Sequence, residues 1–139
     1  MTTFKSLQIT LLAILAIMQS GAVYAACPIG VPSLEHEYKN AAMVFVGHVT
    51  SEDVTPESTN QLDGSTYTIH VEEALRGSRS KSVQIFSENT SGRFPMQVGA
   101  TYLIFAHKEL NRLQIDNCGN SGLLSEKSKA LAIIRKIAP

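Results

Sequence analysis

The fold of this chain is decided by residues 42–50, which have the sequence AMVFVGHVT. β-Branched and aromatic residues fill this stretch, and such residues favour an extended strand over a helix. Gly47 lies inside it and predicts a bulge or a sharp bend. Residues 101–106, with the sequence TYLIFA, carry apolar side chains on both faces and predict a central strand that is covered on both sides.

Three more stretches predict strands, namely residues 66–72, 82–86 and 113–115. The first of them alternates strictly and places Tyr67, Ile69 and Val71 on one face, as in a half-buried strand. Residues 52–65, which lie before it, are polar and rich in turn-forming residues. We therefore expect them to form a long hairpin loop.

Two helices are expected, one near each end of the folded part. Ser33 is a suitable cap for a short helix that carries Leu34 and Tyr38 one turn apart. A second helix is predicted to start at Ser125 near the end of the chain. The apolar residues that share one face of this second helix are Leu131, Ile134 and Ile137.

Five short strands and two modest helices, without parallel crossover units, predict an all-β antiparallel barrel or sandwich. The 139 residues suit one domain preceded by a removable segment. The formal net charge is zero, which argues against a protein that grips nucleic-acid phosphates. The hydrophobic fraction of 44% is too high for a disordered chain.

Residues 1–25 resemble a secretory signal peptide. Lys5 supplies the positive charge, residues 7–18 form the apolar core, and Val23-Tyr24-Ala25 fits the rule for cleavage sites. The core has roughly a dozen residues, whereas a membrane-spanning helix needs about 20. Cleavage after Ala25 would leave a domain of residues 26–139. Cleavage after Ala26, or attachment of a lipid at Cys27, are the alternatives.

Two cysteines, Cys27 and Cys118, are present in the whole chain. In an oxidising compartment such a pair predicts one disulfide rather than a metal site. Closing a loop of this length stabilises a fold by about 4 to 5 kcal/mol in the chain-entropy model. The bridge would attach the start of the domain to a point near its end.

The histidines do not complete a catalytic or metal-binding motif. His36 and Glu37 begin a sequence like that of zinc proteases, but Asn40 stands where the second histidine ligand is needed. His48 and His70 lie on predicted strands that could be neighbours. A pair without a nearby carboxylate or cysteine is more typical of a polar outward face than of a metal site.

The charged residues also predict a solvated surface. Glu52 and Asp53 are adjacent, as are Glu72 and Glu73, and adjacent residues of a strand point to opposite faces. The last helix carries a basic face made of Lys127, Lys129, Arg135 and Lys136. We therefore expect no enzymatic activity, no cofactor and no metal of the protein's own.

The order of the motifs resembles that of a known family. These motifs are AAMVFVGHV at residues 41–49, Arg76-Gly77 after a strand, VGATYLI at residues 98–104 and LQIDNCG at residues 113–119. Together they resemble the N-terminal domain of the tissue inhibitors of metalloproteinases and the wider netrin-like group. The resemblance implies a five-stranded antiparallel OB-type barrel with a short N-terminal helix and a C-terminal helix.

The resemblance also implies a binding site at the mature N-terminus. In the family the first residue is a cysteine whose α-amine and carbonyl oxygen coordinate the zinc of a protease and displace its catalytic water. Here the backbone of Ala26 or Cys27 would ligate the partner's zinc, and Pro28 and Ile29 would follow into the cleft. The family begins with Cys-x-Cys, and Cys118 matches the partner of the second cysteine, so Ala25 stands where the first would be.

Two functions are therefore expected. The first is a secreted or periplasmic inhibitor that caps the zinc of a metalloendopeptidase through its mature N-terminus. The alternative is a protein-binding module of the same OB fold without inhibitory activity. Neither function involves nucleic acid, and neither involves a membrane once the signal peptide is removed.

Overall fold

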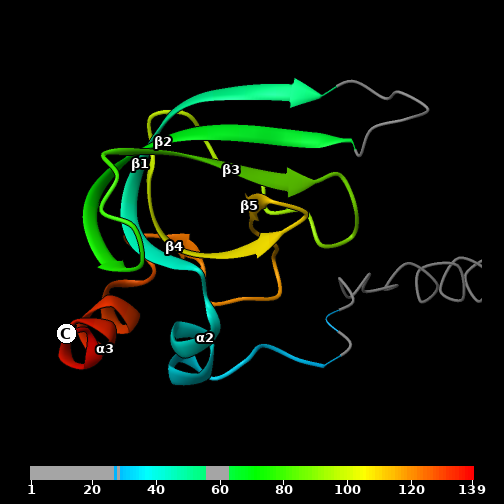
Figure 1. The fold of residues 1–139 in the computed structure, drawn as a ribbon. Helices are drawn as coiled ribbons and strands as arrows, with labels where there is room; N and C mark the ends of the chain where they lie inside the picture. Colours follow the sequence, from blue (N-terminus) through cyan, green and yellow to red (C-terminus); the bar gives the residue numbers. More distant parts are fainter. Residues whose placement is uncertain (1–26, 28, 56–62) are drawn as a thin grey trace, which may run out of the picture.

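The computed structural model describes residues 27, 29–55 and 63–139, and in this part the chain forms a curved sheet with two helices on one side (Figure 1). The elements are α2 (Leu34–Asn40), β1 (Met43–Thr55), β2 (Gly64–Arg76), β3 (Ser82–Glu88), β4 (Thr101–Glu109), β5 (Arg112–Gln114), β6 (Gly122–Leu123) and α3 (Ser128–Ile137). The expected mostly-β fold is confirmed. The predicted signal peptide, Ala26 and Pro28 lie outside the described residues.

The strand pairings form a ring. β1 pairs with β2, β2 with β3, β3 with β5, β5 with β4, and β4 again with β1, while β6 adds two residues to the free side of β4. Every pairing is antiparallel except β3–β5, which is parallel at Phe86 and Gln114. The expectation of five antiparallel strands is wrong at this pair. Directions alternate around an antiparallel ring, so a ring with an odd number of strands must contain a parallel pair.

β1 bends because it carries irregularities in its pairing with β2. One of them falls between Val46 and Gly47, where the bulge was expected. A Cβ atom at position 47 would lie 2.6 Å from Cγ2 of Ile69 and 2.8 Å from Cε2 of Phe45. Glycine is therefore required for the close approach of β1 to β2, and the bend lets the first half of β1 pair with β4 as well.

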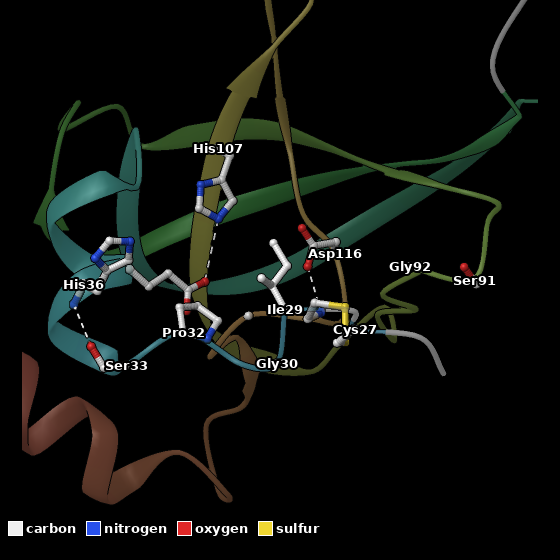
Figure 2. A pocket seen from close by; sticks show the side chains of 13 residues that line it. Cys27, Ile29, Gly30, Pro32, Ser33, His36, Ser91, Gly92, His107 and Asp116 are labelled. Atoms are coloured by element: carbon white, nitrogen blue, oxygen red, sulfur yellow. Dashed lines mark hydrogen bonds and ion pairs between the residues drawn. A yellow bond between two sulfur atoms is a disulfide. The ribbon is translucent and has the colours of Figure 1, made fainter. Parts of the chain in front are cut away.

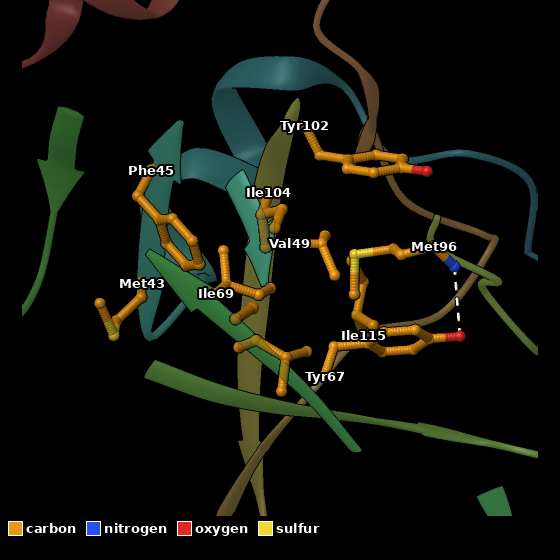
Figure 3. Packing of buried hydrophobic residues seen from close by; sticks show 11 residues of the cluster. Met43, Phe45, Val49, Tyr67, Ile69, Met96, Tyr102, Ile104 and Ile115 are labelled. Atoms are coloured by element: carbon orange, nitrogen blue, oxygen red, sulfur yellow. Dashed lines mark hydrogen bonds between the residues drawn. The ribbon is translucent and has the colours of Figure 1, made fainter. Parts of the chain in front are cut away.

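The two faces of the curved sheet cover two separate hydrophobic clusters. The inner cluster lies within the ring of strands and includes Phe45, Tyr67 and Ile104 (Figure 3). The outer cluster packs β1 and β4 against the helices and includes Val44 and Phe105. Because both clusters use β1 and β4, the buried parts of these strands are apolar on both faces, as was predicted for residues 101–106.

The hairpin loop predicted at residues 52–65 is too long. β1 continues to Thr55 and β2 begins at Gly64, and these two residues pair directly; residues 56–62 lie outside the described residues. Residues 50–54 of β1 are exposed, whereas Gly64 and Ser65 at the start of β2 are buried and pair with β3 as well. A polar composition is therefore compatible with a strand here.

The C-terminal part also differs from the expectation. β6 was not predicted, because a two-residue strand carries no periodic signal. α3 begins at Ser128 rather than at Ser125. Leu131 and Ile134 are buried as expected, whereas Ile137 in the last turn is 42% exposed.

The basic face of α3 meets an acidic residue of the same chain. The Arg135 guanidinium donates two hydrogen bonds to the Glu73 carboxylate on β2, from Nε at 2.9 Å and from an Nη atom at 2.6 Å. This ion pair is partly exposed and fixes α3 against the sheet. Glu73 and Arg135 therefore have a structural role.

Candidate binding site at the N-terminal segment

A disulfide joins Cys27 to Cys118, as the sequence predicted. The two Cα atoms are 5.5 Å apart although the residues are separated by 91 positions in the chain. The bond holds the first described residue against the segment that follows β5 (Figure 2). A disulfide also indicates that the protein folds in an oxidising compartment.

The short segment after Cys27, residues 29–31, lies on the surface. Gly30 donates its backbone N–H to the carbonyl oxygen of Cys27 at 3.0 Å, so the chain turns directly after the disulfide. Gly30 has a φ of 74°, which suits glycine. Ile29 is 98% exposed and Val31 is 60% exposed. The segment therefore presents two apolar side chains to solvent.

The other end of this segment is anchored as well. The Asn120 side chain donates a hydrogen bond from Nδ2 to the carbonyl oxygen of Pro32 at 2.9 Å. The next residue, Ser33, caps α2 by accepting a hydrogen bond from the backbone of His36, as predicted. The segment is thus held by the disulfide at Cys27 and by Asn120 at Pro32.

Glu37 on α2 organises the contacts beneath the segment. It is 3% exposed, and its Oε2 atom accepts two hydrogen bonds from Asn120, from the backbone N at 2.7 Å and from Nδ2 at 2.6 Å. A Cβ atom at Gly119 would overlap the other oxygen, Oε1. Glu37 therefore positions the chain next to Cys118 and does not belong to a zinc-protease motif.

Sequence reasoning missed this role of Glu37. The residue occupies the fourth position of a short amphipathic helix beside the buried Tyr38, and burial of a charged residue there has no periodic signature. Its partner lies 83 positions away in the sequence. The sequence offers one signal: Gly119 and Asn120 directly follow Cys118. This signal marks a constrained segment, but it does not identify a residue of α2 as the partner of that segment.

A cavity of about 720 Å³ lies between the N-terminal segment, α2, β4 and the loop that follows β5 (Figure 2). Its walls include the disulfide, Ile29, Glu37, His107 and Asp116. The His107 Nε2 atom is 3.7 Å from Oε1 of Glu37. The carboxylate of Glu37 raises the pKa of His107 above its ordinary value, with a smaller contribution from Asp116, while partial burial opposes the shift.

The remaining candidates from the sequence are placed elsewhere. His48 and His70 are direct partners across β1 and β2, and His48 Nδ1 lies 3.2 Å from the Thr101 hydroxyl. Within the described ranges, no three residues among His, Cys, Asp and Glu are grouped so that they could hold a metal ion. Of the four proposed partner-binding residues, Cys27 and Ile29 are described and lie together.

No protein-family model matches the chain, and no curated protein matches it. Among the helices of the described part, none has the length and apolar character needed to cross a membrane. The candidate site therefore rests on its own geometry.

Proposed function

We propose that this protein is an exported inhibitor that binds a zinc metalloendopeptidase through its N-terminal segment. The backbone of the mature first residue, Ala26 or Cys27, would cap the zinc of the enzyme. The observation that carries the proposal is the exposure of Ile29, at 98%, in a segment that is anchored at both ends.

Anchoring matters because binding costs conformational entropy. A free chain end would lose that entropy on entering a cleft, whereas a segment held at Cys27 and Pro32 has already lost most of it on folding. Ile29 and Val31 are then available to bury apolar surface against a partner. An α-amine with a pKa near 8 can release its proton and act as a nitrogen ligand.

Two further parts of the proposal concern the fold and the compartment. We infer an OB-type barrel of the netrin-like kind, which the ring of pairings among β1 to β5 supports, since each strand has two neighbours. We also infer secretion or a periplasmic location. The leader-like sequence of residues 1–25 and the disulfide support this inference.

A second candidate function is docking on another exported protein without capping a metal. One observation favours it: the carbonyl oxygen of Cys27 accepts a hydrogen bond from Gly30, which uses one of its two lone pairs. The chain also has a single cysteine at the position where the family carries Cys-x-Cys. In this case Ile29 and Val31 would provide the contact and the α-amine would be unnecessary.

The test is an inhibition assay with the exported protein, whose first residue is established by N-terminal sequencing. The mature protein is compared with a variant that carries one extra alanine in front, against a panel of zinc metalloendopeptidases and a serine protease as control. Capping of zinc predicts inhibition of a metalloendopeptidase by the mature protein and its loss in the extended variant. Equal inhibition by both forms would refute capping, and binding without inhibition would favour the docking function.

A further inference from the structure

The cavity beneath the N-terminal segment has features that zinc capping does not use. Its volume of about 720 Å³ falls in the range of pockets that hold small ligands. It is lined from five separate parts of the chain: the N-terminal segment, α2, β4, the loop around Gly92 and the loop around Cys118. The cavity opens beside Ile29, whose side chain stands between His107 and Asp116 in Figure 2.

The first of these features is a carboxylate oxygen of Glu37 whose one ionic partner in the described part of the chain is His107. Oε2 of Glu37 accepts both hydrogen bonds from Asn120, whereas Oε1 makes no hydrogen bond within the described part of the chain. The nearest cationic group is the His107 ring, whose Nε2 atom lies 3.7 Å from Oε1, beyond hydrogen-bond distance. Glu37 is 3% exposed and lines the cavity, and its Oε1 atom is paired with His107 at 3.7 Å but accepts no hydrogen bond from the described part of the chain.

A second carboxylate, that of Asp116, also lines the cavity. One oxygen of Asp116 accepts a hydrogen bond from the backbone N of Cys118 at 2.7 Å, and the residue is exposed. No lysine or arginine is among the described residues that line the cavity. Within the described residues, the two carboxylates face only the imidazoles of His36 and His107, so an entering cation would meet two acidic groups and would compete with the His107 proton for Glu37.

The remaining wall is apolar. Ile29, Pro32 and the disulfide lie beside the two carboxylates. An inorganic ion would make no use of this surface, whereas a cation on a short hydrocarbon stem would cover it. Such a ligand would bury its stem and place its charge against Glu37 and Asp116.

We infer that this cavity binds an organic cation, an ammonium or guanidinium group on a short apolar stem. The charged group is placed between the Glu37 and Asp116 carboxylates, and the stem lies against Ile29 and Pro32. The ligand is either a free amine or the side chain of a lysine or arginine in another protein. This inference does not rest on the proposed inhibition, because its test involves no protease.

The test uses the exported, disulfide-bonded protein labelled with ¹⁵N and titrated with n-butylammonium, followed by NMR. We expect shifts at Ile29, His107 and Gly119 that saturate with a dissociation constant in the millimolar range, and no such shifts with the neutral isostere n-butanol. A bound cation should also lower the pKa of His107, because the cation and the His107 proton compete for the Glu37 and Asp116 carboxylates. His36 is the other imidazole that lines the cavity. Saturation with n-butanol at the same residues would overturn the inference.

Asp116→Asn is the decisive variant, because asparagine keeps the oxygen that accepts from Cys118 and removes the charge. We expect it to weaken n-butylammonium binding about tenfold. The control Glu126→Gln removes one charge from an exposed residue that does not line the cavity, and should leave binding unchanged. Equal affinity of Asp116→Asn and the unmodified protein would overturn the inference.

A second arm identifies the source of the cation. A short blocked peptide with one internal lysine is compared with the same peptide containing norleucine. Tighter binding of the lysine peptide than of n-butylammonium supports a protein side chain as the ligand, and binding of the amine alone supports a free amine. Absence of binding by both cations would refute the inference.

Discussion

Glu37 and Asn120 are 83 positions apart in the sequence, yet the Glu37 carboxylate accepts two hydrogen bonds from Asn120, at 2.7 and 2.6 Å. Asn120 in turn holds the carbonyl oxygen of Pro32 at 2.9 Å. These contacts connect α2, the segment behind Cys118 and the N-terminal segment. One buried carboxylate therefore reinforces the attachment that the disulfide makes through a covalent bond.

Glu37→Ala should lower the free energy of unfolding by about 3 kcal/mol, because it leaves the backbone N–H and the side-chain amide of Asn120 without an acceptor in a part-buried site. Glu37→Gln keeps an oxygen and should cost about 1 to 2 kcal/mol. Urea unfolding with the disulfide intact measures both values.

Asn120→Ala provides the control for this contact. If the hydrogen bonds between Glu37 and Asn120 cause the destabilisation, the double variant Glu37→Ala/Asn120→Ala should lose less unfolding free energy than the sum of the two single variants. We expect the difference to be at least about 1 kcal/mol. Additive effects would show that Glu37 stabilises the fold by some other means.

His107 should make stability depend on pH. Its pKa is raised in the folded protein, chiefly by Glu37 and also by Asp116, with burial opposing. Its stabilising contribution is therefore complete below the unfolded pKa of about 6.5 and is lost as the pH rises through the higher folded pKa. Its side chain is 41% exposed, so the contribution should stay below about 1 kcal/mol.

The measurement is the difference in unfolding free energy between the unmodified protein and His107→Gln, taken near pH 6 and near pH 8.5. We expect the difference to be larger at the lower pH. A difference that is constant, or larger at high pH, would contradict the assignment of the raised pKa to the Glu37 contact.

The strands were predictable where burial imposes a pattern on the sequence. The first half of β1 and residues 102–106 of β4 are buried on both faces and are largely apolar, and Gly47 marks the bulge in the pairing of β1 with β2. Residues 50–54 at the end of β1 are exposed, and nothing in their polar sequence distinguishes an exposed strand from a loop. The parallel pairing of β3 with β5 follows from the closure of the ring, which local sequence does not encode.

The candidate site was predictable only through its cysteines. In an oxidising compartment the two cysteines of the chain, Cys27 and Cys118, have only each other as partners within the chain. The contacts of Glu37 with Asn120 and His107 join residues from three separate elements, and each residue alone looks like an ordinary surface residue. Such contacts depend on the tertiary fold, and a single sequence does not record them.

Removing the disulfide should destabilise the fold strongly. The double variant Cys27→Ala/Cys118→Ala opens a loop closed over 91 positions, and the chain-entropy model gives a loss of about 4 to 5 kcal/mol. Because Asn120 still holds Pro32, residues 33 onward should stay folded while residues 27–31 become sensitive to proteases. Urea unfolding and limited proteolysis measure the two effects; a loss below about 1 kcal/mol would contradict the entropic role of the bridge.

The exposed apolar residue Ile29 should matter for binding and not for folding. At 98% exposure its side chain buries almost nothing, so Ile29→Ala should change the unfolding free energy by less than about 0.5 kcal/mol. The same change should weaken binding to a partner protein at least fivefold, since a buried isoleucine side chain contributes about 1.5 kcal/mol or more. The matched control is Ile133→Ala on α3, where an exposed isoleucine lies outside the N-terminal segment. If both variants reduce binding equally, or Ile29→Ala leaves it intact, the N-terminal segment is not the docking surface.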